Sequence, residues 1–495
     1  MHTILICAKD FVPIPTLKKS LPENKERTMG GLFGTVSKGD CVSDLFYGTD
    51  YHSHLGTRRG GLAVYGPTGF NRSIHNIESN YFRSKFESEL SEFSGNYGVG
   101  VISDTDPQPL IIGSHLGTFA IVTVAKINNT EELENRALGK KTHFLETSGG
   151  VINPTELAAT LICEENSFED GIRNAQEAIK GSCSMLLLTK EGVYAARDRL
   201  GRTPIAVGKR DGAFAVASES CAFPNLGYEV ETQLGPGETI FLTADGYEQR
   251  NKPGDRMQIC SFLWVYYGYP ATEYEGINVE FTRNKCGSAL ARKDEVEIDF
   301  VAGIPDSGIG HAIGYANEKK IPYVRPFVKY TPTWPRSFMP QNQEVRDLVA
   351  RMKLIPIRSI IEDKRILFCE DSIVRGTQLK DNIEILFDYG ALEVHMRPAC
   401  PTLIFPCEFL NFSTSRSNLD LAGRSVINEI EGSEDINMDD YITPGSEKYV
   451  EMIKRIQQRL RLTTLQYQRL DDMVNAIGLP KEKLCTHCWD GSSYF

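Results

Sequence analysis

The sequence predicts a mixed fold of two domains, an α+β domain followed by an α/β domain with a parallel sheet, and a short helical end. Short β-rich runs separated by Gly, Asn and Asp turns fill residues 30–258. Strand-like and helix-like runs alternate over residues 259–445, and a helical pattern leads residues 446–495. At 495 residues the chain is long enough for separate cores.

The first domain is expected to be rich in short strands. Its clearest apolar runs are Met185–Leu188, Val193–Ala196, Ala213–Ala217 and Thr239–Thr243. Turn residues bound each of these runs, which is typical of β-structure.

The second domain alternates between two periodicities. Expected strands are Asp299–Gly303, Ile366–Cys369 and Glu393–Met396, and the expected helices between them are Ile309–Lys319 and Gln378–Tyr389. This order predicts βαβ units and a parallel sheet, which binds ligands at the carboxyl ends of its strands.

One of those ends carries the most informative loop of the chain. The apolar run Ile366–Cys369 is followed by two carboxylates, Glu370 and Asp371, and then by the turn Ser372–Gln378. The carboxylates can hold Mg²⁺ or sugar hydroxyls, and the turn can present N–H groups and hydroxyls to a phosphate at a helix N-terminus. The combination suits a phosphorylated sugar.

Bulk properties exclude several classes of protein. The net charge of −11 argues against a nucleic-acid scaffold, which needs a basic face. No apolar run approaches the ~20 residues of a membrane span. The first 28 residues lack the long apolar region of a secretory signal, so the cytoplasm is the expected location.

Twelve cysteines in a chain of this size do not indicate a disulfide scaffold. The segment Cys485-Thr486-His487-Cys488 is a C-x-x-C, which in a reducing compartment is more often metal-binding or redox-active than structural.

Five stretches together resemble the glutamine phosphoribosyldiphosphate amidotransferases, enzymes of the first committed step of purine synthesis. They are the Ile366–Gln378 loop, Leu188–Gly201, Val216–Ala222, Gly303–Gly314 and Ala476–Gly491. The resemblance implies an N-terminal Ntn-hydrolase-like αββα sandwich that releases ammonia from glutamine. It implies that a type I phosphoribosyltransferase parallel-sheet domain follows, which uses the ammonia to displace pyrophosphate from phosphoribosyl diphosphate (PRPP).

The resemblance assigns roles in the transferase domain residue by residue. Glu370, Asp371, Lys329 and Arg336 match catalytic positions, and Ser307, Glu370 and Asp371 would hold Mg²⁺. The matched substrate-binding residues are Asp306, Ser307, Gly308, Ser372, Ile373, Val374, Arg375, Gly376 and Thr377.

The glutaminase domain departs from the family pattern. Gly30 stands where the family has its nucleophilic cysteine, and a side chain without a heteroatom cannot attack an amide. Val101, Val124 and Pro154 replace an arginine, an oxyanion-stabilising residue and an aspartate. We therefore expect no glutamine hydrolysis, and we expect residues 1–29 to be a leader that is not processed. Cys41 could replace the missing nucleophile, but we expect it to be a buried or loop thiol without a catalytic role.

The resemblance also pairs the C-x-x-C with two other cysteines. Cys260, Cys407, Cys485 and Cys488 fall where one branch of the family ligates a [4Fe–4S] cluster. Four thiolates suit iron–sulfur or Zn²⁺ equally on composition, and the resemblance favours iron–sulfur. In that branch the cluster ties the domain junction, the transferase domain and the C-terminus together.

Three functions remain open on the sequence. The first is a transferase that makes 5-phosphoribosylamine from PRPP and free ammonia. The second is an enzyme that uses another small amine or hydrolyses PRPP. The third is a non-catalytic regulatory paralogue, which the altered loop Lys329–Phe338 would fit. The family adds purine nucleotides as candidate effectors and a homo-oligomer, dimer or tetramer, as the candidate assembly.

Overall fold

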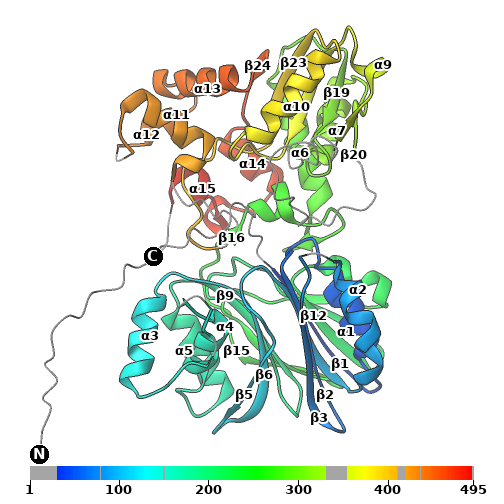
Figure 1. Cartoon of the computed structure of the whole chain (residues 1–495), viewed down its shortest axis with the longest axis vertical. Coiled ribbons are helices and arrows are strands. Elements are labelled where there is room, and N and C mark those ends of the chain that lie inside the picture. The colour runs from blue at the N-terminus through cyan, green and yellow to red at the C-terminus, as the bar shows by residue number, and fades with distance from the viewer. Residues whose placement is uncertain are drawn as a thin grey trace, which may run out of the picture.

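Two stacked bodies make up the protein in the computed structural model (Figure 1), which describes residues 30–492 apart from 79, 146, 149–150, 330–353, 411–417 and 435. The lower body in Figure 1 holds two antiparallel sheets face to face, and the upper body holds a small parallel sheet. The end of the chain, with α14 (Leu470–Ile477) and α15 (His487–Asp490), lies between them.

Both large sheets of the first domain are antiparallel throughout, as is the small ribbon of β7 (Thr147–Ser148) and β8 (Val151–Ile152). The seven-stranded sheet runs β13-β11-β12-β1-β4-β2-β3 and the six-stranded sheet runs β15-β14-β10-β9-β6-β5. The strands of the first are β1 (Gly31–Ser37), β2 (Arg59–Gly66), β3 (Gly69–Asn76), β4 (Tyr97–Ser103), β11 (Ala206–Arg210), β12 (Ala213–Ala217) and β13 (Glu229–Gln233). Those of the second are β5 (Leu110–Ser114), β6 (Gly117–Ile127), β9 (Gly181–Leu188), β10 (Val193–Ala196), β14 (Thr239–Thr243) and β15 (Gly246–Asn251).

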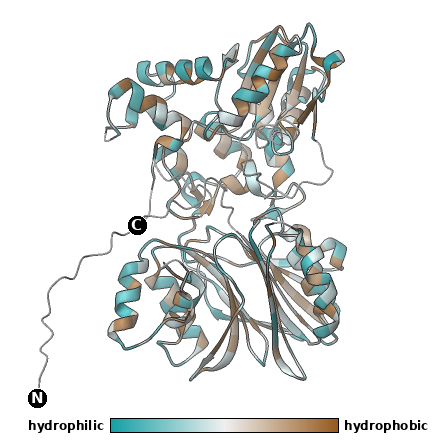
Figure 2. Ribbon diagram, in the orientation of Figure 1, coloured by the Kyte–Doolittle hydropathy of each residue, from teal (hydrophilic) through white to brown (hydrophobic). Residues whose placement is uncertain are grey.

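Helices cover the outer face of each sheet. Helices α1 (Val42–Asp50) and α2 (Phe82–Phe86) lie on the first sheet, and α3 (Thr130–Gly139), α4 (Pro154–Ile162) and α5 (Phe168–Ala178) lie on the second (Figure 1). The hydrophobic residues gather on the strands (Figure 2), because both faces of each sheet are covered. The expected αββα sandwich is confirmed.

The second domain is built on a four-stranded parallel sheet. Its order is β19-β22-β23-β24, formed by β19 (Phe300–Gly303), β22 (Arg365–Glu370), β23 (Glu393–Pro398) and β24 (Thr464–Leu465). Helices α6 (Val279–Arg292), α7 (Gly308–Lys319) and α10 (Thr377–Asp388) accompany the sheet, with a short hairpin of β20 (Phe327–Lys329) and β21 (Leu354–Pro356) and the turn α9 (Arg358–Ile361). The expected parallel-sheet domain is confirmed.

The C-terminal part is not helical throughout. Helices α11 (Ala422–Glu431), α12 (Asp439–Ile442) and α13 (Glu447–Arg459) precede the strand β24, and α14 (Leu470–Ile477) follows it. Thr463 donates its N–H to Val394 O at 2.8 Å, so the chain joins the edge of β23 rather than continuing as a helix. The β-branched pair Thr463-Thr464 suits that extended backbone.

The chain end returns to the junction of the two domains. Strand β25 (Leu484–Cys485) pairs in parallel with β16 (Ile259–Cys260), and α15 (His487–Asp490) follows it. A second small ribbon at the junction joins β17 (Glu273–Tyr274) to β18 (Ile277–Asn278). Across the described residues, no helix has both the length and the apolar character that crossing a bilayer requires.

Candidate functional site

Two loops of the second domain meet at the carboxyl edge of the parallel sheet. Strands β19 and β22 are parallel neighbours, and Gly303 of β19 is paired with Cys369 of β22. A loop connects β19 to α7, and another connects β22 to α10. The N–H of Ile304 donates to Cys369 O at 3.0 Å. A Cβ on Gly308 would lie 2.4 Å from Cys369 O, so only glycine allows this close approach of the loops.

An acidic pair lies where the loops meet. Ser307 Oγ donates to Asp371, and Ser372 Oγ donates to Asp371 Oδ1 at 2.6 Å. Burial raises the pKa of both carboxyls, and the neighbouring charge of Asp371 raises that of Glu370 further. Burial disfavours the ionised form of both carboxyls, and a hard cation such as Mg²⁺ would stabilise that form. The predicted residues Ser307, Glu370 and Asp371 are therefore brought together.

The loop after the acidic pair is held at both ends. Gly376 adopts φ +79° just before α10 begins at Thr377. The N–H of Ala422 donates to Val374 O at 2.7 Å, and Arg375 lies 3.3 Å from Asp420. The start of α10 thus has the glycine turn and helix N-terminus that phosphate sites use.

The predicted cation Lys329 also reaches these loops. It ends β20, and its ammonium group forms an ion pair with Asp306 of the β19–α7 loop. Its side chain is 43% exposed, so it can exchange this partner for a ligand phosphate. Arg336 lies outside the described residues.

The chain is similar in sequence to known proteins that contain such a domain arrangement. A family model for the glutamine amidotransferase domain matches residues 98–225. The amidophosphoribosyltransferase of Methanothermobacter thermautotrophicus is 30% identical over 484 residues, covering 95% of each chain. That of Bacillus subtilis is 30% identical over 81% of this chain and 85% of the relative.

The chain belongs to the amidophosphoribosyltransferase family.

The fold agrees with a solved family structure. The glutamine PRPP amidotransferase of Bacillus subtilis, complexed with ADP and GMP, matches with a TM-score of 0.80 and 26% identity. The match covers 93% of this chain and 96% of that one.

Position 30, where the resemblance predicts the family's nucleophile, is closely confined in this chain. Gly30 lies at the start of β1 with φ +97°, and its N–H donates to Leu55 O at 2.8 Å. A Cβ added there would lie 2.6 Å from Ile102 O and 3.5 Å from Val124 Cγ2. Any side chain at position 30 would collide with the backbone of β4.

The other residues predicted to depart from the family pattern lie in apolar surroundings or begin a helix. Val101 pairs with Leu32 across β4 and β1, and Val101 and Val124 are 1% and 4% exposed within one core cluster. Pro154 is the first residue of α4. Cys41 is fully buried, and burial raises the pKa of its thiol, so it is poorly suited to act as a nucleophile.

A buried polar group beside Gly31, the residue after Gly30, was not predicted from the sequence. His52 donates from Nδ1 to Gly48 O at 2.8 Å and accepts the N–H of Glu219 at 3.2 Å. Burial lowers the pKa of His52 to about 4, so it is neutral at pH 7. The two histidines of the segment Tyr51–His54, out of nine in the chain, were the available signal.

Glu219 connects this group to the second domain. Its carboxylate accepts from Tyr274 Oη at 2.6 Å and from the Tyr269 N–H at 3.1 Å, and it lies 2.8 Å from His54 Nε2. Burial opposes its ionisation, but His54, His52 and Tyr274 together hold its pKa at about 2. The carboxylate is therefore ionised at neutral pH and fixes the β17 segment against the first domain.

The four predicted cluster cysteines converge at the junction. Cys260 and Cys485 are direct neighbours in the β16–β25 pair, and a hydrogen bond with Cys488 lowers the pKa of Cys407 although burial opposes this. All eleven cysteines of the described part are free. Within that same part of the chain, no set of three or more His, Cys, Asp or Glu side chains is placed so that it could hold a metal ion. Cys260, Cys407, Cys485 and Cys488 would supply the four thiolate ligands that an iron–sulfur cluster needs.

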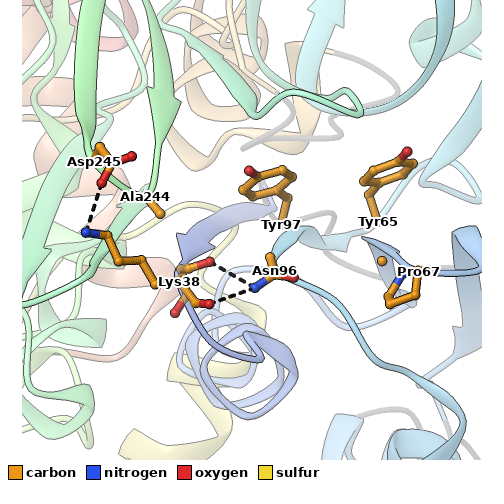
Figure 3. A pocket seen from close by; sticks show the side chains of 9 residues that line it. Lys38, Tyr65, Pro67, Asn96, Tyr97, Ala244 and Asp245 are labelled. Atoms are coloured by element: carbon orange, nitrogen blue, oxygen red, sulfur yellow. Dashed lines mark hydrogen bonds and ion pairs between the residues drawn. The ribbon is translucent and has the colours of Figure 1, made fainter.

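A surface pocket of the first domain lies elsewhere (Figure 3). It has a volume of about 370 Å³ and lies at the Ser37 end of β1, about 20 Å from Gly30 along a seven-residue strand. Lys38 is paired with Asp245 at 2.9 Å, and the Asn96 amide donates to three carbonyl groups. Since these polar groups already have partners, the pocket carries little chemistry.

Proposed function

We propose that this protein transfers the phosphoribosyl group of PRPP to free ammonia, forming 5-phosphoribosylamine and pyrophosphate with Mg²⁺. The observation that carries the proposal is the contrast between the two centres. The loops around Glu370 and Asp371 retain their acidic pair, whereas the space at Gly30 has no room for a nucleophile.

The residues at the acidic loops suit displacement at the anomeric carbon. Mg²⁺ held by Ser307, Glu370 and Asp371 would neutralise the charge that develops on the leaving pyrophosphate. The carboxylates favour the positive charge that develops on the ribose, and Lys329 favours the diphosphate. The loop Ser372–Thr377 would bind the 5-phosphate at the start of α10.

The nitrogen source follows from the first domain. With glycine at position 30 there is no thiol to attack glutamine, and Val101 and Val124 provide apolar groups where binding of a polar substrate needs partners. The domain then serves as a scaffold that fixes the junction through Glu219. Ammonia enters the transferase site from solvent.

The cofactor proposal is a [4Fe–4S] cluster held by Cys260, Cys407, Cys485 and Cys488. Support comes from the convergence of the four thiols and from the neighbouring N–H groups, such as that of Leu410, which lies 3.3 Å from Cys407 Sγ. Such a cluster would join β16, the segment after β23 and the chain end. A zinc site would have the same ligands but no visible absorbance.

The relatives also suggest how this protein is regulated and assembled. The solved Bacillus subtilis enzyme is complexed with ADP and GMP, and we propose purine nucleotides as effectors of this protein. We also propose a homo-oligomer, dimer or tetramer.

The test is pyrophosphate release from PRPP by anaerobically purified protein with Mg²⁺ and ammonium. Release should require all three components and should be lost in the Glu370→Ala/Asp371→Ala double variant. Equal release by that variant, or none by the wild type, would overturn the proposal.

A further inference from the structure

Arg202, a residue of the first domain, contacts the site formed by Cys260, Cys407, Cys485 and Cys488. It lies between β10 and β11 in the first domain, and its side chain is fully buried. Its Nη1 lies 3.2 Å from Cys485 Sγ, and its Nη2 donates to Gln258 Oε1 at 3.0 Å.

The same residue contacts two more segments that carry cluster cysteines. Its guanidinium carbon lies 3.4 Å from the ring centroid of Phe409, two residues beyond Cys407. Its carbonyl accepts the N–H of Cys260 at 3.3 Å. One arginine thus links Cys260, the Cys407 segment and Cys485.

The burial of this guanidinium calls for negative charge nearby. Removing a cation from water is unfavourable unless an anion or well-placed acceptors compensate for it. A neutral thiol is a weak acceptor, whereas a thiolate bound to iron is an anionic one. The stacking on Phe409 fixes the plane of the guanidinium, so that its fork faces Cys485 and Gln258.

We propose that Arg202 compensates the negative charge of an iron–sulfur cluster held by the four thiols. This positive charge would raise the reduction potential of the cluster. The inference rests on the proposed cofactor. Reduction adds an electron to a group that is already anionic, so a cation at a ligand sulfur stabilises the reduced state more than the oxidised one.

A second cation of the first domain makes a different contact. Lys126 donates to the Cys407 carbonyl and Asn128 Nδ2 donates to the Glu408 carbonyl at 2.6 Å. These contacts hold the domains together but reach backbone oxygen, not sulfur. Lys126 therefore adds positive charge near Cys407 without touching its sulfur, whereas the guanidinium of Arg202 contacts a ligand sulfur directly.

The experiment is a redox titration of the anaerobically purified full chain, followed by visible absorbance and electron paramagnetic resonance, with iron and sulfide determined. At the wild-type midpoint, Arg202→Met should lower the reduced-to-oxidised ratio about tenfold, which is ~59 mV for a one-electron couple. Arg202→Lys, which keeps the charge, should stay close to wild type.

A matched control separates this effect from structural damage. Arg197 is equally buried in the same loop, but it donates to the carbonyls of Leu234 and Gly201. Arg197→Met should destabilise the protein without moving the midpoint. If Arg202→Met does not retain iron, the neutral Arg202→Gln must show the lower midpoint.

Two outcomes would overturn the inference, and they differ. Wild-type protein without iron would overturn the proposed cluster and this inference together. A cluster whose midpoint is the same in Arg202→Met, Arg202→Gln and wild type would overturn the role of Arg202 alone.

Discussion

Placing a cysteine at position 30 should destabilise the protein and should not create glutaminase activity. Gly30 has φ +97°, where a residue with a side chain is strained by about 1–3 kcal/mol. The added Cβ would also lie 2.6 Å from Ile102 O, a backbone atom fixed by the pairing of β1 with β4. Overpacking of this kind costs about 1–3 kcal/mol more. We therefore expect Gly30→Cys to lower the free energy of unfolding by about 2–6 kcal/mol in sum.

Two controls isolate the causes. Gly30→Ala adds the same Cβ without a thiol and should be destabilised nearly as much. Gly69 has φ +92° and no heavy atom within 4 Å of an added Cβ, so Gly69→Ala should show the strain alone. Stability would be measured by thermal unfolding followed by circular dichroism, and hydrolysis by glutamate release.

Glutamate release by Gly30→Cys above the level of Gly30→Ala would refute the account of this centre. So would equal melting temperatures of Gly30→Ala and Gly69→Ala.

Three further predictions concern charge. The pKa of Glu370 is raised in the folded state, so the folded protein binds this proton more tightly than the unfolded chain does. The free energy of unfolding should therefore fall as pH rises above about 4.5. Glu370→Gln should have a higher melting temperature at pH 7 and should lose any stabilisation by Mg²⁺. His52 is held neutral with a pKa of about 4 against 6.5 in the unfolded chain, so about 3 kcal/mol of stability should be lost between pH 6.5 and 4; in His52→Gln, which can keep both hydrogen bonds, melting temperature should depend less on pH over this range. Lys329→Met should raise the KM for PRPP about tenfold, as expected for one lost charged contact, and leave the melting temperature unchanged, because its ion pair with Asp306 is exposed; an unchanged KM would exclude Lys329 from the site.

Much of the fold could be predicted from local pattern. The expected strands Val193–Ala196, Ala213–Ala217 and Thr239–Thr243 match the structure at both ends, because apolar runs between turns fix them locally. The acidic loop could be predicted because its residues are consecutive and follow a buried strand.

What could not be predicted depends on pairs far apart in the chain. Arg202 and Cys485 are 283 residues apart, and Glu219 meets Tyr274 across the junction of the two domains. No local periodicity reports such contacts. Strand β24 was missed for a related reason: two residues pair with an existing sheet edge and carry little pattern of their own.

The most direct test of the central claim is the source of nitrogen. Pyrophosphate release from PRPP and Mg²⁺ would be measured with ammonium or with glutamine as the only nitrogen donor, while glutamate is followed in the same samples. The account predicts release with ammonium, and neither release nor glutamate with glutamine. Glutamate formed in step with pyrophosphate would contradict it.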